Sequence, residues 1–121
     1  MKAWVLHDIG NIILDEAAVP EPSDGEVLLR VRAAGICGSD IPRIYDTGAH
    51  NMPLIPGHEF AGEVVGVGNG VSGGLVGMRA GVFPLIPCKK CRPCSERQYE
   101  MCRGYSYLGS RRDGGFAEYV S

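Results

Sequence analysis

Four of the five cysteines lie in one short stretch, CKKCRPCSERQYEMC, at residues 88 to 102. Their spacing, C-x2-C-x2-C-x7-C, allows four thiols to surround one metal ion. Thiolates suit structural Zn²⁺, and four protein sulfurs leave no coordination position for a substrate. The expected ligands of such a zinc ion are Cys88, Cys91, Cys94 and Cys102. Two disulfides, free reactive thiols or an iron–sulfur cluster are the alternatives, although the usual C-x3-C-P continuation of a ferredoxin run is absent.

The fifth cysteine belongs to a second group of potential metal ligands. Cys37 lies in GICGSD (35–40), and His58 and Glu59 follow in GHEFAG (57–62). A catalytic zinc takes about three such protein ligands and keeps one position open for water or substrate. Spacing alone does not decide the matter, because a lone cysteine is more often a core residue and a His-Glu pair is more often part of a turn.

Short strands must position these residues. Eighteen glycines and eight prolines among 121 residues favour many turns over long helices. Alternating apolar residues predict a half-buried strand over 26–35. The other predicted elements are strands at 2–6, 11–14, 59–68, 79–86 and 114–121 and a short helix over 37–45. The expected fold is mainly β, with short helices and a cysteine-rich lobe.

Composition is that of one soluble globular domain, with 45% hydrophobic and 21% charged residues. The net charge of -2 gives no reason to expect nucleic acid as a partner, and no apolar run is long enough for a membrane span. The first residues lack the features of a signal peptide. We expect a cytoplasmic protein, in which clustered cysteines bind metal more often than they form disulfides.

One glycine motif imitates a nucleotide-binding fingerprint. GNGVSG (68–73) satisfies G-x-G-x-x-G after a predicted strand. The following residues contain four more glycines among ten and show no helical period, so no phosphate-binding helix is expected there. We interpret the motif as a turn between strands.

The ordered motifs GICGSD, GHEFAGEVVGVG, the four-cysteine lobe and DGGFAEYV resemble the zinc-dependent medium-chain dehydrogenases, in particular their polyol dehydrogenase branch. The resemblance covers essentially the whole chain. It implies that residues 1–121 form a GroES-like catalytic domain, a partly open β-barrel with a zinc-binding lobe. A nucleotide-binding Rossmann domain would follow residue 121. The implied activity is oxidation of a secondary alcohol of a polyol or sugar-alcohol phosphate with NAD, by a full-length homo-oligomer (dimer or tetramer).

The resemblance also implies roles for individual residues. Cys37 and His58 match the ligands of the catalytic zinc, and Glu59 matches a glutamate that is a ligand in some states. Ser39 matches the hydroxyl that takes the proton of the alcohol, and Asp40 matches the carboxylate that holds the histidine ligand. The four clustered cysteines match the ligands of the structural zinc.

Two positions depart from the family pattern. Pro42 stands where some alcohol dehydrogenases have a relay histidine, so the proton must leave by another route. Met78 stands where the family usually has an aspartate in a Gly-Asp pair, which we expect to affect only a turn.

Candidate substrate-binding residues follow from charge. Arg111 and Arg112, in GSRRDGG (109–115), could meet a substrate phosphate, because a guanidinium group binds phosphate bidentately. Solvation, or pairing with a local acid, is the more common state of adjacent arginines in a loop. His50 is a further candidate, although a histidine in such a loop is more often a loop or pocket-wall residue than a catalytic base.

Two other functional classes fit parts of this pattern. A stand-alone zinc-binding or interaction module would keep both metal sites and perform no redox chemistry. A quinone reductase of the same fold would use no zinc, which the cysteine lobe together with Cys37 and His58 disfavours. The sequence after Ser121 separates the first alternative from a dehydrogenase, because only the latter needs a nucleotide-binding domain.

Overall fold

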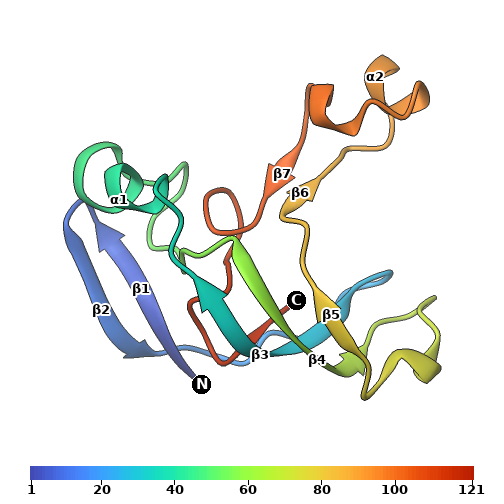
Figure 1. The fold of residues 1–121 in the computed structure, drawn as a ribbon, viewed down its shortest axis with the longest axis horizontal. Helices are drawn as coiled ribbons and strands as arrows, with labels where there is room; N and C mark the ends of the chain where they lie inside the picture. The colour runs from blue at the N-terminus through green and yellow to red at the C-terminus, as the bar shows by residue number, and fades with distance from the viewer.

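The computed structural model describes residues 1–121 and consists mainly of short antiparallel strands (Figure 1). The largest sheet has, in spatial order, the strands β5 (Arg79–Gly81), β4 (Glu59–Val67), β3 (Val27–Gly35) and β8 (Tyr119–Val120). Two further pairs are β1 (Lys2–Asp8) with β2 (Asn11–Glu16), and β6 (Leu85–Ile86) with β7 (Ser106–Tyr107). These sheets do not close into one barrel, which confirms the predicted mainly β, partly open architecture.

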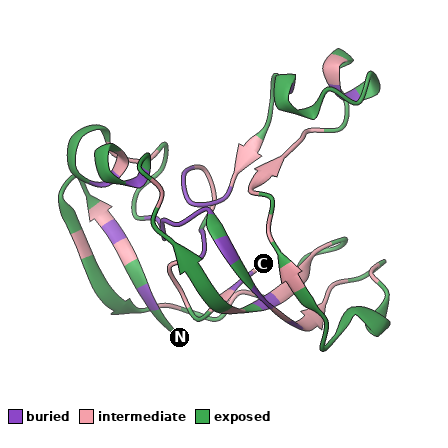
Figure 2. Ribbon diagram, in the orientation of Figure 1, coloured by how far each residue is buried: buried purple, intermediate pink, exposed green.

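The hydrophobic core lies where β3 and β4 meet the C-terminal part of the chain. Alternation places Leu29 of β3 opposite Val64 of β4, and both side chains are buried. The buried core residues are Leu29, Phe60, Val64, Leu108 and Val120. Figure 2 shows the buried residues gathered at the centre of the molecule, while the outer strands and the cysteine lobe are largely exposed.

The segment before β8 joins the N-terminal hairpin to the large sheet. The Trp4 N–H donates to the Phe116 carbonyl at 2.8 Å, and Ala3 forms a β-bridge with Ala117. A few residues later, Val120 pairs with Leu29 of β3. One short stretch therefore holds both parts of the body together.

The cysteine lobe projects from this body on the β6–β7 ribbon (Figure 1). It contains the short helix α2 (Arg92–Ser95) and the 3-10 turn η3 (Tyr99–Met101). Cys94 and Cys102 are its only buried residues between positions 87 and 104. The lobe has no apolar core, so something other than hydrophobic burial must hold it together.

Three predicted elements differ from those observed. The helix expected over 37–45 begins later, as α1 (Asp40–Pro42) followed by a π-helical turn, η1 (Arg43–Thr47). The strand expected over 79–86 is split into β5 and β6 with Pro84 between them, since proline cannot donate a ladder hydrogen bond. The strand expected over 114–121 is reduced to β8, because Gly114 and Gly115 pack tightly against other parts of the chain.

The glycine-rich motif forms a turn, as predicted. Residues 68–72 connect β4 to a single 3-10 turn, η2 (Gly73–Leu75), and no longer helix follows. The motif therefore lacks the helix N-terminus that would bind a pyrophosphate. None of the helices in the structure has the length and apolar character needed to cross a bilayer.

A long-range ion pair fixes the loop before β8. Arg112 Nη1 lies 2.8 Å from Glu26 Oε1 and, by this hydrogen bond, holds the pKa of Glu26 below its usual value. A lowered carboxylate pKa stabilises the fold above the unfolded-state value near 4.5, and this stabilisation is lost as pH falls through the folded-state value.

We expect Glu26→Gln to lower the melting temperature by about 2–4 °C at neutral pH. The difference between wild type and variant should begin to shrink below about pH 4.5 and disappear once the pH is below the lowered pKa of Glu26. Thermal melts of both proteins across pH measure it. A difference that grows on acidification would contradict this role of the pair.

Candidate metal centres

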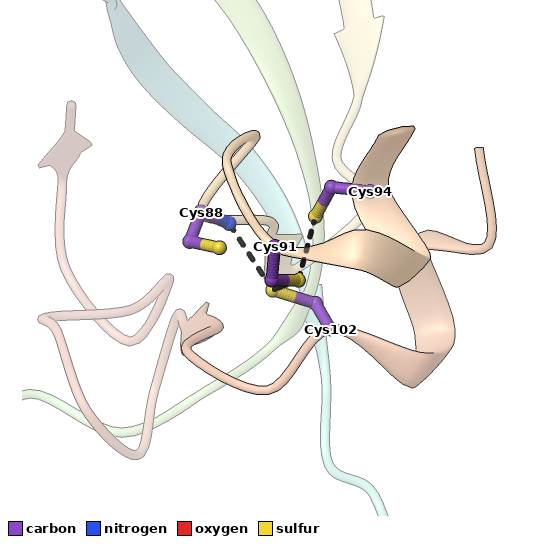
Figure 3. A group of neighbouring side chains, drawn as sticks. All are labelled: Cys88, Cys91, Cys94 and Cys102. Carbon is purple, nitrogen blue, oxygen red and sulfur yellow. Dashed lines mark hydrogen bonds between the residues drawn. The ribbon is translucent and has the colours of Figure 1, made fainter. Parts of the chain in front are cut away.

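The four clustered thiols converge on one point in the lobe, as Figure 3 shows. Their sulfur atoms all lie within 4.8 Å of one another. Cys91 Sγ is 3.5 Å from Cys94 Sγ and 3.9 Å from Cys102 Sγ, and the backbone N–H of Cys88 donates to Cys102 Sγ at 3.2 Å. The structure thus brings together all four residues that the spacing singled out.

These distances fit a tetrahedral metal site. Four sulfurs bonded to Zn²⁺ at about 2.3 Å are separated by about 3.8 Å along the edges of the tetrahedron. A disulfide would require a separation near 2.05 Å, and all five cysteines of the chain are free. The donor set is closed, because all four coordination positions would be taken by protein.

The backbone of the cysteine lobe adopts a strained conformation at two positions. Lys89 and Arg97 are the only residues other than glycine with positive φ, at 58° and 61°. Such conformations persist where the surroundings over-determine them. Both lie in turns between cysteines, which is where a shared metal ion would fix the backbone.

The thiols differ in how readily they lose a proton. The backbone N–H of Lys90, followed by the Cys102 thiol, lowers the pKa of Cys88 to about 6. The pKa of Cys91 is also lowered, mostly by the hydrogen bond from the backbone N–H of Arg103. Burial raises the pKa of Cys94 to about 12. A set containing one such buried thiol needs a cation to become fully deprotonated.

Cys37, His58 and Glu59 form the second cluster, which brings together two separate parts of the chain. Cys37 follows β3, His58 lies in the buried segment that precedes β4, and Glu59 begins β4. One ligand atom of each lies within 4.8 Å of the others. Gly35 leaves room for the carboxylate, since a Cβ there would lie 3.1 Å from Glu59 Oε2.

This second cluster is open to solvent on one side. His58 is buried, Cys37 is half-buried and Glu59 is exposed. With three donors from one thiolate, one imidazole and one carboxylate, the set fits a zinc ion that keeps a position free. It contrasts with the closed shell of four sulfurs in the lobe.

Asp40 contacts Cys37 and His58 from the buried side of the cluster. It is 0% exposed, and its Oδ2 accepts a hydrogen bond from the Cys37 backbone N–H at 2.9 Å. Its Oδ1 lies 3.2 Å from Arg43 Nη1 and 3.2 Å from His58 Nδ1. The His58 contact has the distance of a hydrogen bond but not its angle, so Nδ1 is buried without a well-aligned partner. This arrangement leaves His58 Nε2 as the atom available to a metal.

Ser39 stands on the exposed side of the same cluster. Its hydroxyl donates to Cys37 Sγ at 3.4 Å. The hydroxyl oxygen therefore lies beside this cluster, on an exposed residue. This is the position from which a proton can pass between a bound group and water.

Close backbone contacts between glycines position His58. Gly57 adopts φ of 92°, and the Gly115 N–H donates to the Gly57 carbonyl at 2.9 Å. A Cβ on Gly109 would lie 2.6 Å from that carbonyl oxygen, and a Cβ on Gly114 would collide with it. Two glycines outside the cluster thus allow the loop to press against the residue next to His58.

We expect Gly114→Ala to destabilise the domain by about 3 kcal/mol, because neither backbone segment can yield to the added methyl group. It should also weaken metal binding at His58, which is attached to the displaced segment. Thermal melting and zinc content measure the two effects. Gly81→Ala is the control, since a Cβ there meets no atom within 4 Å. Equal melting temperatures for the two variants would refute the role assigned to this contact.

The two arginines predicted to meet substrate each contact another residue of the domain. Arg112 is paired with Glu26, and the Arg111 guanidinium stacks over the Tyr105 ring at 4.9 Å from its centroid. His50 lines a pocket together with Tyr107, whose ring lies 5.7 Å from that of His58.

Sequence reasoning missed Arg43 and Tyr107. Arg43 lies three residues after Asp40, which is a spacing that lets two side chains meet on a helical turn, so a signal was present. Tyr107 is 49 positions from His58 in the sequence, and no local pattern connects them.

Comparison with known proteins identifies the family. Residues 23–121 match the alcohol dehydrogenase GroES-like domain, so the chain belongs to that family. It is 42% identical over 121 residues to galactitol 1-phosphate 5-dehydrogenase of Escherichia coli strain K12. The matched region covers 99% of this chain and 35% of that protein. The chain thus spans about a third of the length of this relative.

Two solved structures have the same fold. An alcohol dehydrogenase from Escherichia coli CFT073 complexed with NADH superimposes with a TM-score of 0.93 at 38% identity, over 99% of this chain and 35% of that chain. The cobalt- and zinc-bound thermostable alcohol dehydrogenase from Pyrobaculum aerophilum gives a TM-score of 0.91 at 38% identity, over 99% of this chain and 38% of that chain.

Proposed function

We propose that residues 1–121 form the zinc-binding catalytic domain of an NAD-linked dehydrogenase that oxidises a secondary alcohol of a polyol or sugar-alcohol phosphate. The observation that carries the proposal is the presence of two unlike ligand sets in one chain, one closed by four sulfurs and one open with three mixed donors. The family membership and the similarity to galactitol 1-phosphate 5-dehydrogenase support the class of reaction and substrate.

The two sets receive different roles. The four cysteines of the lobe would hold a structural zinc ion, because they leave substrate no access to the metal. Cys37, His58 and Glu59 would hold the catalytic ion on the solvent-accessible side of the domain. Zinc in such a site supplies a Lewis acid that lowers the pKa of a coordinated hydroxyl group.

Ser39 would accept the proton that the substrate hydroxyl gives up. Its oxygen lies beside Cys37 and reaches solvent, so the proton can continue to water without a further side chain. This route suits the presence of Pro42 in place of a relay histidine. Asp40 would orient His58 and the Cys37 backbone without touching substrate.

The hydride acceptor would bind outside residues 1–121. The glycine-rich motif of this chain is a turn with no following helix, so it offers no pyrophosphate site. The NADH complex of the similar alcohol dehydrogenase supports NAD as the acceptor. We further propose that the whole protein is a cytoplasmic homo-oligomer; the free thiols suit a reducing compartment.

The test is a dehydrogenase assay of the protein encoded by the complete gene. Galactitol 1-phosphate and sorbitol should each be tried with NAD⁺ while NADH formation is followed. We expect turnover that is lost on removal of zinc and in Cys37→Ser. A complete gene that encodes no nucleotide-binding domain after Ser121 would instead support a zinc-binding module without redox activity.

A further inference from the structure

A pocket of ≈ 340 Å³ separates the body of the domain from the cysteine lobe. Its polar lining comes from both sides: Arg43, His50 and Ser110 from the body, and Glu100, Tyr105 and Tyr107 from the lobe and its ribbon. The volume is sufficient for a small polar ligand. We refer to these six residues and the space between them as the lobe pocket.

The lobe pocket adjoins the open metal cluster through two contacts. The Tyr107 ring lies 5.7 Å from the His58 ring, with the planes inclined at 57°. On the other wall, Arg43 Nη1 contacts the same Asp40 carboxylate that contacts His58. Two wall residues of the lobe pocket thus touch residues of the open cluster or of its surroundings, which makes the pocket a candidate place for the remote end of a molecule that reacts there.

Hydrogen-bond donors dominate the lining. Arg43 is half-buried, and only Nη1 of its guanidinium is used, in the contact with Asp40. Ser110 is 4% exposed, and its hydroxyl makes no hydrogen bond within the chain. His50, Tyr105 and Tyr107 also line the pocket and have side chains that can donate, whereas Glu100 is the only carboxylate in the lining.

Unused donors around a half-buried guanidinium suit a phosphate group, which offers several acceptor oxygens and binds arginine in a charge-assisted manner. The adjacent arginines of the loop do not line the pocket. Arg112 is engaged by Glu26, and the Arg111 guanidinium lies 4.9 Å from the centroid of the Tyr105 ring.

We propose that the lobe pocket binds a phosphate monoester, with Arg43 as the residue that sets specificity for a phosphorylated over an unphosphorylated polyol. This inference rests on the proposed function, because it assumes that the substrate reacts at the open cluster. Arg43 binds the phosphate through the N–H groups that Asp40 leaves free, and Ser110 and His50 complete the site.

Binding can be measured without turnover. The zinc-loaded chain is titrated with inorganic phosphate, galactitol 1-phosphate and galactitol, and NMR resonances of the Arg43, His50 and Ser110 groups are followed. Both phosphate compounds should shift these resonances, with tighter binding of galactitol 1-phosphate, and galactitol should leave them in place. Tighter binding of inorganic phosphate would mean that the pocket serves the free anion and not a substrate.

Variants test the residues separately. Arg43→Gln should raise the dissociation constant for galactitol 1-phosphate about tenfold or more, since it removes a charge-assisted contact. Because it also removes the arginine partner of the buried Asp40, two milder variants accompany it. His50→Ala should weaken binding about threefold, and Glu100→Gln should strengthen it about twofold by removing a like charge.

Arg32→Gln is the matched control. Arg32 also holds a carboxylate, Glu63 at 3.0 Å, but does not line the lobe pocket. The dissociation constant of Arg32→Gln for galactitol 1-phosphate should equal that of wild type. Unchanged affinity in both His50→Ala and Glu100→Gln, or phosphate-induced shifts centred on Arg111 and Arg112, would overturn the assignment.

Phosphate binding in the lobe pocket can be tested independently of the proposed dehydrogenase activity. Cys37→Ser removes a ligand of the open cluster but no residue of the lobe pocket, so it should still bind inorganic phosphate. If the dehydrogenase assay fails while phosphate still binds at Arg43, the reaction class is wrong and the subsite stands. Turnover without phosphate binding at Arg43 would mean that the reaction class is right and the phosphate subsite is wrong.

Discussion

Cys91→Ser is expected to unfold the cysteine lobe while the body of the domain stays folded. Amide exchange over 88–103 should accelerate by about two orders of magnitude or more, because the free energy of local opening falls toward zero once the metal is lost. Hydrogen exchange read by NMR or mass spectrometry measures it, with the zinc-loaded wild type as reference.

The physical reason is that the lobe has little else to hold it. Its only buried residues are Cys94 and Cys102, which are themselves expected ligands, and two of its turns have left-handed φ at Lys89 and Arg97. Cys91 Sγ lies 3.5 Å from Cys94 Sγ and 3.9 Å from Cys102 Sγ. Removing this sulfur leaves three thiolates, which no longer complete a four-sulfur metal site that could hold the strained turns.

Two control variants locate the effect. Ser95→Ala removes an exposed hydroxyl of the same helix, α2, which donates to the Arg92 carbonyl at 2.8 Å, and should change exchange in the lobe far less than Cys91→Ser does. Cys37→Ser removes a ligand of the open cluster and should leave the lobe equally protected. Equal loss of protection in Cys91→Ser and Cys37→Ser would contradict the division into a structural and a catalytic site.

Asp40→Ala is expected to damage both stability and metal binding in the body. Removing a fully buried partner of Arg43 leaves a charge without compensation, which costs about 3–5 kcal/mol. His58 and the Cys37 N–H lose their contact at the same time, and loss of such an outer carboxylate lowers metal affinity about 10–100-fold. Denaturant unfolding and zinc titration measure the two effects.

Asp46→Ala is the matched control, because Asp46 is exposed and lies in the neighbouring turn η1. It should change neither quantity. Asp40→Asn, which keeps the shape of the side chain, should lose less stability than Asp40→Ala but still weaken metal binding. An Asp40→Ala protein with the zinc affinity of wild type would show that the carboxylate does not orient the ligands.

Much of the fold was predictable because its central strands have strong local patterns. Alternating apolar residues placed β3 and β4 within about a residue of their observed bounds, since one face of each strand is buried. The tightly spaced glycines near β8 were misread as strand, because their role depends on Gly57, far away in the sequence. Contacts of that kind have no local signature.

The candidate site was predictable to a similar extent. Residue type and order singled out both ligand sets, and the structure brings each set together. What the sequence could not supply were the partners across the fold. Nothing near Arg112 reveals that it pairs with Glu26, 86 positions earlier, or that Arg43 is the arginine beside the open cluster.

Counting zinc ions per chain tests the central claim most directly. Elemental analysis of the purified protein should find two zinc ions in wild type and one in Cys37→Ser, with the lobe still protected from exchange in that variant. Cys91→Ser should lose the lobe ion. A wild-type protein without zinc, or a Cys37→Ser protein that retains two ions, would contradict the account of one structural and one catalytic metal.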